Sequence, residues 1–321
     1  MRKWLRRLRW IAVTIGILIG VGVIAVLIGF GIWRSSIVRD LNAHSLVVAT
    51  ARGPVEYAEL GHGPAVLVIH GTPGGYDLWL NSLEAMHAAG DGFRDILPSR
   101  PGYLRTPLGD GATPAEQADV LAALLDALHI GKAAVIGVSG GGPAALQFAL
   151  RHGDRCSALV LEEAVVRRLS ESTSDLPRSA LAAGYRDFRI FLLYEAAGLY
   201  PTKPQYAEAF AVARAQLRAS APYALREAGL VNDLAQEAAI GSWPLSQIRA
   251  PTLILQGTAD QNVPPADAEY AHAQIGSSQL VEFPGADHLM VIWKARQLSS
   301  LVRQFLRAHP EPAPSPSVAV R

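Results

Sequence analysis

The chain has 321 residues, of which 50% are hydrophobic and 18% charged, and its formal net charge is +1. The apolar content excludes an intrinsically disordered chain, which would be poor in apolar residues and rich in charge. The near balance of basic and acidic residues argues against a partner such as nucleic acid, whose phosphates call for a basic excess. The single cysteine, Cys156, excludes an intrachain disulfide and a cysteine-rich zinc site.

The N-terminal segment has the composition of a membrane anchor. Five basic residues fall within the first nine positions, and the following residues 10–33 contain no charged side chain. As a helix this run would be about 36 Å long, enough to cross about 30 Å of hydrocarbon. Because the basic cluster precedes the run, residues 1–33 are predicted to be a cytoplasmic basic stub followed by a transmembrane signal anchor. The protein would then be a single-pass membrane protein with the rest of the chain outside the cytoplasm.

The alternative for this segment is a cleaved signal peptide, whose apolar core would be about 7–15 residues long and followed by a small-residue cleavage site. Here the run is longer and ends in Trp33-Arg34, which favours an uncleaved anchor. Residues 34–45 are expected to form a polar stalk. Residues 309–321 are proline-rich and are expected to be a disordered tail that packs no core.

From residue 46 onward, short apolar strands alternate with helices, which predicts a mostly parallel sheet covered on both faces. Residues 65–70 and 134–138 are continuous apolar runs, typical of strands buried on both faces. Residues 46–50 and 54–60 are expected to form a hairpin. The other expected strands are residues 94–99, 157–161, 252–256 and 279–283, and the expected helices are residues 113–129, 140–152 and 289–308.

The alternation breaks over residues 165–243, where the chain is rich in alanine and aromatic residues. Helix-like stretches occur around residues 178–200, 205–219 and 224–240. An insertion of this kind lies over the carboxyl edge of the sheet, where ligands bind. We therefore expect an inserted helical cap.

The motif GVSGG at residues 137–141 follows a predicted buried strand and begins a predicted helix. This is the context of a nucleophile elbow, in which a serine on a tight strand-to-helix turn needs small neighbours. Ser139 is therefore the candidate nucleophile.

A glycine-rich turn, HGTPGG at residues 70–75, directly follows another buried strand. An oxyanion needs preorganised backbone N–H donors, and such a turn lets the backbone approach the nucleophile closely. The candidate donors are the N–H groups of Thr72 and of Gly140, the residue after the candidate nucleophile. An ordinary Gly-Pro turn is the alternative, and His70 is expected to organise the loop rather than act as a base.

Two further candidates follow strands nearer the C-terminus. Asp260 ends the motif GTAD after the strand at residues 252–256, and His288 ends the motif GADH after the strand at residues 279–283. The order Ser139, Asp260, His288, with each residue at a strand end, matches the arrangement of a Ser–His–Asp triad in α/β hydrolases. We therefore predict that these three residues are catalytic.

Residues 46–308 resemble the α/β-hydrolase fold superfamily, within its group of serine esterases and proline iminopeptidase-like enzymes. The resemblance rests on the motifs HGTPGG, SRPGY, GVSGGG, GTAD and GADH. It implies a mostly parallel sheet of the eight-stranded type with helices on both faces and an inserted helical cap. The segment at residues 99–104 departs from the Asp-x-x-Gly-x-Gly of relatives, so the resemblance leaves the role of that loop open.

In that family the position of Ser139 is the nucleophile, that of Asp260 the acid and that of His288 the base, while Thr72 and Gly140 supply the oxyanion hole. These roles predict a serine hydrolase that cleaves a carboxylic ester of a small molecule through an acyl-enzyme. The reaction requires no metal and no cofactor. A serine at the elbow disfavours haloalkane dehalogenases and epoxide hydrolases, whose elbows carry an aspartate.

Several residues near the predicted site have alternative roles. Glu162 and Glu163 follow a strand and are a rival source of the acid, although Asp260 is preferred. Asp287 is expected to shape the loop of His288. A set of aromatic side chains is expected either to line an acyl pocket or to form the core of the cap: Tyr76, Trp79, Phe188, Phe191, Tyr194 and Tyr206.

Two other functions remain open from the sequence. An aminopeptidase of the proline iminopeptidase type would need acidic residues to hold a substrate amine, although such enzymes usually carry glycine at the position of Thr72. The cap contains four glutamates that could hold such an amine, namely Glu195, Glu208, Glu227 and Glu237. A non-catalytic scaffold that kept the fold is less expected, because every member of the predicted triad is present.

Overall fold

The strands of this computed structural model, which describes residues 2–85, 92–169, 179–199 and 203–310, pair in the order β1-β2-β4-β3-β5-β6-β7-β8. The first two strands form the expected hairpin, and the second also pairs antiparallel with β4, whereas all later neighbours are parallel. The strand bounds are β1 (Leu46–Thr50), β2 (Gly53–Gly61), β3 (Ala65–Ile69), β4 (Arg94–Pro98), β5 (Ala133–Val138), β6 (Cys156–Glu162), β7 (Thr252–Gly257) and β8 (Ser278–Phe283).

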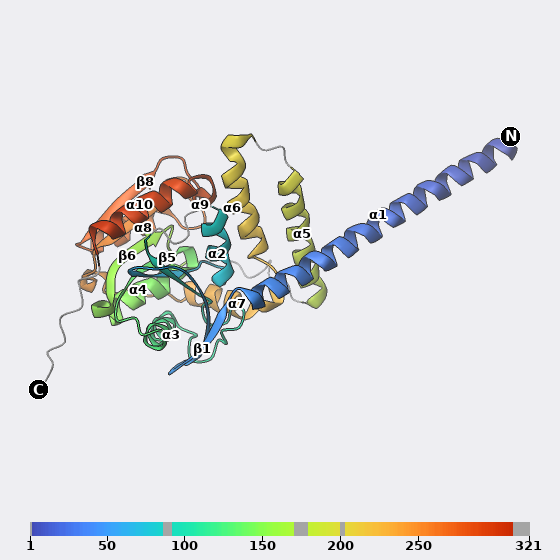
Figure 1. Cartoon of the computed structure of the whole chain (residues 1–321). Helices are drawn as coiled ribbons and strands as arrows, with labels where there is room; N and C mark the ends of the chain where they lie inside the picture. Colours follow the sequence, from blue (N-terminus) through green and yellow to red (C-terminus); the bar gives the residue numbers. More distant parts are fainter. Residues whose placement is uncertain (1, 86–91, 170–178, 200–202, 311–321) are drawn as a thin grey trace, which may run out of the picture.

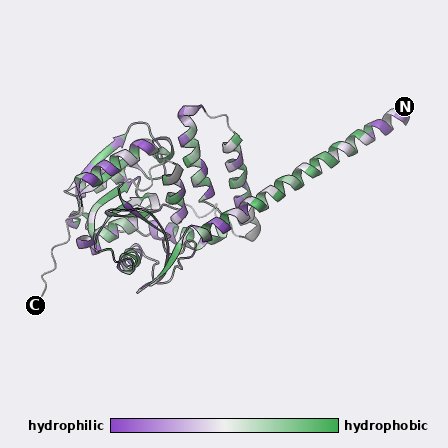
Figure 2. Cartoon of the chain, in the orientation of Figure 1, coloured by the Kyte–Doolittle hydropathy of each residue, from purple (hydrophilic) through white to green (hydrophobic). Residues whose placement is uncertain are grey.

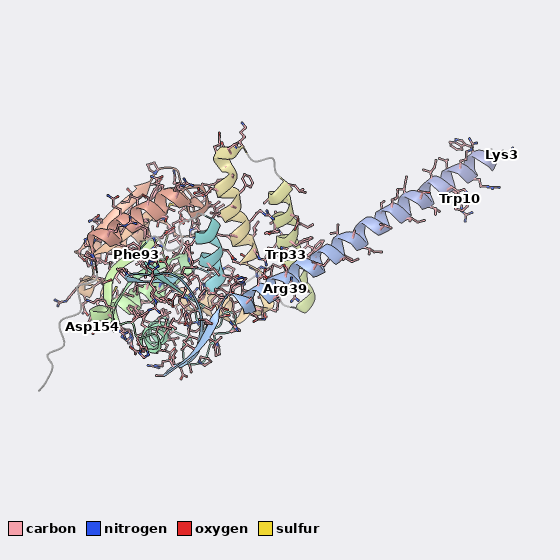
Figure 3. The ribbon with its side chains drawn as sticks, in the orientation of Figure 1. Lys3, Trp10, Trp33, Arg39, Phe93 and Asp154 are labelled. Carbon is pink, nitrogen blue, oxygen red and sulfur yellow. The ribbon has the colours of Figure 1, made fainter. Side chains whose placement is uncertain are left out.

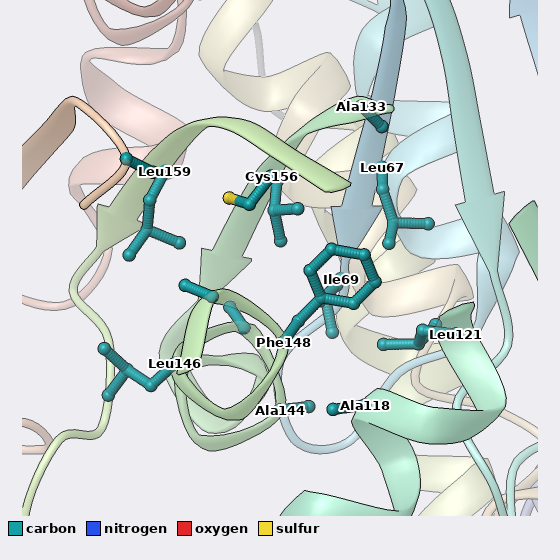
Figure 4. Packing of buried hydrophobic residues seen from close by; sticks show 14 of the residues in the cluster. Leu67, Ile69, Ala118, Leu121, Ala133, Ala144, Leu146, Phe148, Cys156 and Leu159 are labelled. Atoms are coloured by element: carbon teal, nitrogen blue, oxygen red, sulfur yellow. The ribbon is translucent and has the colours of Figure 1, made fainter. Parts of the chain in front are cut away.

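Helices cover both faces of the sheet (Figure 1). Alternate residues of the central strands point to opposite faces, so Leu67 packs in one apolar cluster and Val68 in the other. One face is covered by α3 (Pro114–Ala127), α4 (Gly142–Arg151) and α8 (Pro265–Gln274), and the other by α2 (Tyr76–Ala85) and α10 (Ala295–Ala308). Figure 4 shows Leu67 and Ile69 of β3 beside Leu121 of α3 and Phe148 of α4.

The predicted helix start at Thr113 is confirmed. The Thr113 hydroxyl accepts a hydrogen bond from the Glu116 N–H, the Glu116 carboxylate accepts one from the Thr113 N–H, and Pro114 occupies the first turn. The predicted helix over residues 289–308 is wrong in one respect. It is divided into α9 (Met290–Trp293) and α10, with Lys294 between them outside α-helical geometry.

The chain between β6 and β7 supplies the cap. Its helices are α5 (Ala180–Leu199), α6 (Ala207–Arg218) and α7 (Glu227–Glu237), close to the stretches that the sequence indicates. No strand occurs among the described residues of this region. The cap helices lie on the side of the body from which the N-terminal helix α1 projects (Figure 1).

The N-terminal helix α1 runs from Arg2 to Ala43 without a break, so the predicted stalk at residues 34–45 is wrong. Trp33, Ile37 and Leu41 recur every fourth residue and are buried against the body, and the Tyr76 hydroxyl donates to the Leu41 carbonyl at 2.9 Å. Apolar side chains at this spacing give the segment a face to bury, which a polar stalk would lack.

The outer part of α1 projects away from the body and is apolar along most of its length (Figure 2). Residues Arg6–Ala43 contain a window of mean hydropathy 3.0, none of which is buried inside the protein. Trp10 lies towards the far end of this rod and Trp33 where it meets the body (Figure 3). The chain therefore has one helix among its described residues that is long and apolar enough to cross a membrane.

Candidate active site

Ser139 lies on a strained turn between β5 and α4. Its φ is +50°, a left-handed conformation that is uncommon for residues other than glycine. The turn brings β5 and α4 so close that a Cβ atom on Gly137 would lie 2.5 Å from the Ala145 Cβ, and one on Gly141 2.5 Å from the Ile69 carbonyl oxygen. The small residues of the motif are thus required by close backbone approach, as expected of a nucleophile elbow.

The structure brings Ser139, His288 and Asp260 together. The Ser139 Oγ lies 3.1 Å from His288 Nε2, and His288 Nδ1 lies 2.8 Å from Asp260 Oδ2. Asp260 is buried, whereas the other two are half-buried. The two loops that follow β7 and β8 are tied together, because the Ala259 N–H donates to the Ala286 carbonyl at 2.8 Å. Side chains that are far apart in the sequence therefore form one hydrogen-bonded relay.

The environment of Asp260 keeps its carboxyl ionised. Burial alone would raise the pKa of this group, but the hydrogen bond with His288 and those from the backbone N–H groups of Val263 and Asn262 outweigh burial and hold the pKa below its ordinary value. An ionised carboxylate accepts from the Nδ1–H of His288. It therefore holds the imidazole in the tautomer whose Nε2 can accept the Ser139 proton.

The rival acids Glu162 and Glu163 do not hydrogen-bond to His288. Burial raises the pKa of Glu162 to about 7, and burial together with the neighbouring carboxyls raises the pKa of Glu163 to about 10. Glu163 is therefore protonated at pH 7 and Glu162 only partly ionised, and a protonated carboxyl does not stabilise a cationic imidazole as an ionised one does. The geometry therefore favours Asp260 over both, as expected. Asp287 caps the next turn by accepting from the Leu289 N–H at 3.0 Å.

Glu163, Asp260 and His288 form the cluster of described residues that could hold a metal ion, since their ligand atoms lie within 4.8 Å of one another. Both ring nitrogens of His288 already have hydrogen-bond partners, Ser139 and Asp260. A metal ion would have to displace one of these partners. The cluster is therefore better suited to moving a proton than to holding a cation.

Thr72 and Gly140, the predicted oxyanion donors, are neighbours in space. A Cβ atom on Gly140 would lie 2.1 Å from Thr72 Oγ1 and 3.0 Å from the Thr72 Cβ, and one on Gly71 would lie 3.0 Å from the Ser139 Cβ. The glycine-rich turn after β3 is therefore packed directly against the elbow. His70 organises this turn: its Nδ1 donates to the Gly71 carbonyl at 2.8 Å and its Nε2 accepts from a backbone N–H at 3.0 Å.

The loop at residues 99–104, whose role the sequence left open, holds the cap to this turn. The Arg100 guanidinium binds both oxygens of Asp233 on α7 at 2.8 and 2.6 Å, and the Tyr103 hydroxyl donates to the same carboxylate at 2.5 Å. The Thr72 hydroxyl also donates to Asp233, at 2.6 Å. Sequence analysis missed this network. A buried ion pair between a loop and a helix 133 residues apart leaves no local pattern.

A second buried ion pair anchors the start of α7. The Arg226 guanidinium contacts both oxygens of Asp77 at 3.0 and 2.8 Å and the Gly74 carbonyl at 2.6 Å. Burial raises the pKa of Asp77, and Arg226 opposes that shift. With Arg100 and Asp233, this pair fixes α7 over the glycine-rich turn. The cap is therefore attached to the site through charges that are shielded from water.

The six aromatic residues that were expected to line an acyl pocket or to form the core of the cap do not form one pocket. Trp79 lines a cavity of about 50 Å³ between the sheet, α2 and α10, which Glu162 also lines. Three cap aromatics instead pack on the ring side chains of α1, and Tyr206 is 45% exposed. The three that contact α1, namely Phe188, Phe191 and Tyr194, also pack within the cap, since Arg214 of α6 lies over the Tyr194 ring at 4.2 Å. They therefore belong to a core that the cap shares with α1.

The comparison with known families identifies the family to which the chain belongs. A family model described as "alpha/beta hydrolase fold" matches residues 64–295, which include every predicted site residue. The chain belongs to the alpha/beta hydrolase fold family. The elbow, the strand-end carboxylate and the strand-end histidine described above are the features of that fold that carry reactive groups.

Individual relatives are alpha/beta hydrolase fold proteins, and some of them are named as hydrolases of different kinds. An alpha/beta hydrolase fold protein from Nakamurella multipartita is 35% identical, with a TM-score of 0.69 over 83% of this chain and all of that chain. A thermophilic esterase from Thermogutta terrifontis is 27% identical, with a TM-score of 0.59 over 83% and 100%. A 2-hydroxy-6-oxo-6-phenylhexa-2,4-dienoate hydrolase from Comamonas testosteroni is 28% identical over 79% of this chain and 91% of its own length. These relatives support a hydrolase.

Proposed function

We propose that this α/β hydrolase is a serine hydrolase that cleaves a carboxylic ester, with Ser139 as nucleophile, His288 as base and Asp260 as acid. The observation that carries the proposal is the relay from Asp260 through His288 to Ser139 at the carboxyl ends of three parallel strands. The esterase among the similar solved structures supports an ester as the substrate bond.

The geometry leads to a mechanism in two halves. Ser139 Oγ attacks the ester carbonyl carbon while His288 Nε2 takes its proton, and the ionised Asp260 stabilises the resulting imidazolium. The backbone N–H groups of Thr72 and Gly140 stabilise the tetrahedral oxyanion. His288 then gives the proton to the leaving alcohol, and water releases the acyl group from Ser139 by the same steps.

A fluorophosphonate probe combined with a substrate panel tests this proposal. The full-length protein is expected to react with the probe, because only an activated serine does so, and to hydrolyse p-nitrophenyl esters of graded chain length. A protein that stays unlabelled while a control hydrolase reacts would support the non-catalytic scaffold instead. The same panel includes thioesters and amides. Probe labelling without ester turnover, but with turnover of one of these, would indicate that the enzyme cleaves another acyl bond.

One observation favours a second candidate, an aminopeptidase of the proline iminopeptidase type. Of the four cap glutamates, Glu237 is buried beside the elbow, and a Cβ atom on Gly140 would lie 2.6 Å from its Oε1. A carboxylate in that position could hold the amine of a substrate. Hydrolysis of proline arylamides faster than p-nitrophenyl esters would support this candidate, and the reverse would support the esterase.

We also propose that residues 10–33 span a bilayer, with the N-terminus in the cytoplasm and the catalytic domain outside it. The uncharged length of α1 and the five basic residues before it support this orientation. An alkaline phosphatase fused after residue 45 is expected to be active in a bacterial host. If this fusion is inactive and a matching cytoplasmic reporter fused at the same residue is active, the orientation is the opposite of the one proposed.

A further inference from the structure

The outer face of cap helix α5 carries an exposed apolar stripe. Tyr185, Leu192, Ala196 and Leu199 recur at steps of three, four and seven residues and lie along one side of the helix. Leu192 is 45% exposed and Leu199 82%, and Leu193 beside them is 55% exposed. An apolar stripe of this length on one helix is more than scattered single side chains and marks an interaction surface.

This helix lies across α1 at the level where the proposed membrane span ends. The rings of Phe30 and Phe188 are 5.4 Å apart and those of Trp33 and Tyr194 are 5.8 Å apart. Arg34, the first charged residue after the apolar run, pairs with Asp187 at 3.7 Å. Figure 1 shows α5 crossing α1 on the side of the body from which α1 projects. Any bilayer that contains residues 10–33 therefore has its surface at α5.

We propose that α5 is a second membrane-contacting element, whose outer stripe from Tyr185 to Leu199 lies in the lipid interface. The inference rests on the proposed span of α1, and the occupant of the surface is the bilayer itself. Continuity with α1 favours lipid over a second copy of the chain, because the anchor brings the bilayer to this face at the moment of insertion. An amphipathic helix held in this way lies in the interfacial plane with its apolar side among the acyl chains.

The exposed charged side chains of α5 are Arg189 and Glu195. Glu195 lies to one side of the stripe, whereas Arg189 lies within it, four residues after Tyr185 and three before Leu192. Arg189 lies over the Tyr185 ring at 6.0 Å, and an arginine–tyrosine pair suits the headgroup level, where an apolar stem and ring meet a polar tip. The stripe thus has the composition of an interfacial helix.

The placement has a consequence for the substrate. The cap helix that contacts lipid is connected to the site, because Asp187 on α5 accepts from the Tyr223 N–H at 3.0 Å, three residues before Arg226. An ester that partitions into the bilayer would therefore reach the cap without crossing bulk water. We expect Leu192→Glu to lower kcat/KM about tenfold for a membrane-partitioned long-chain ester, because it removes apolar area that the interface would bury and adds a negative charge to that face. Turnover of a water-soluble acetate ester should be unchanged.

Depth-dependent quenching tests the placement directly. The full-length protein is reconstituted at one copy per lipid nanodisc, and an environment-sensitive fluorophore is attached to Leu192→Cys, to Val21→Cys in α1, or to Glu269→Cys on α8. The native Cys156 is buried and burial raises its pKa to about 12, so it stays unlabelled. Nitroxide lipids are expected to quench residue 192 from a shallow position and residue 21 from a deep one, and not residue 269.

The controls separate the inference from the anchor on which it rests. If residue 21 is quenched and residue 192 is not, the span stands and the contact of α5 with lipid is refuted. If residue 21 is itself unquenched, the span fails and the inference with it. A third outcome is that the fluorophore at residue 192 is unquenched at one copy per nanodisc but reports shielding from water when two copies are loaded. This outcome would assign the stripe to contact with a second chain and would also overturn the inference.

Discussion

Ser139→Ala is expected to lower kcat for ester hydrolysis by about 10⁴ to 10⁶-fold and to abolish labelling by a fluorophosphonate. The alanine removes the proposed attacking atom, Ser139 Oγ, while the proposed oxyanion donors stay in place. The turn itself should persist, because the neighbouring glycines and not the hydroxyl make the close packing possible. Steady-state kinetics and a thermal unfolding curve measure the two quantities separately.

Ser157→Ala is the matched control for this substitution. Ser157 is half-buried in β6, at the end of the sheet opposite to the predicted site. A serine outside the relay should change kcat little, and its effect on the free energy of unfolding should be within about 1 kcal/mol. Turnover retained by the Ser139 variant, with a folded protein, would place the nucleophile elsewhere and end the proposed mechanism.

The second large effect is expected at Asp233, where Asp233→Ala should cost about 3–5 kcal/mol of stability and lower kcat as well. The substitution leaves the buried Arg100 guanidinium without its carboxylate, and an uncompensated buried charge is strongly destabilising. It also removes the acceptor of the Thr72 hydroxyl. A misplaced oxyanion donor should lower kcat by about 10 to 100-fold. Chemical denaturation and kinetics measure the two losses.

Asp126→Asn supplies the control for a carboxylate in an ion pair. Asp126 pairs with Arg155 at 2.6 Å, but its side chain is 68% exposed, so the variant should lose less than about 1 kcal/mol. Should Asp233→Ala fail to fold, Tyr103→Phe removes only the 2.5 Å hydrogen bond to the same carboxylate and should cost about 1.5–3 kcal/mol. A fully stable Tyr103→Phe variant would contradict the proposed contribution of the Asp233 network to stability.

Elements that local chemistry specifies can be predicted from the amino-acid residues alone. Continuous apolar runs are typical of strands buried on both faces, so β3 and β5 were predicted from their composition alone. The capping box at Thr113 was predicted because its partners lie within one helical turn. Ser139, Asp260 and His288 could be proposed for a related reason, since each lies in the turn or loop that follows a strand, and parallel strands end at the same edge of the sheet.

How distant segments meet depends on the folded arrangement of the whole chain. The attachment of Asp233 to Arg100 and Tyr103 depends on where the cap helix docks, and an ion pair between distant segments has no period to detect. The end of α1 is similar. Residues 34–43 have the composition of a polar stalk that would not pack on the catalytic domain, yet Ile37 and Leu41 are buried against it. Local signals depend on residues that are neighbours in the sequence, whereas the burial of a side chain depends on a surface that forms only when distant segments fold together.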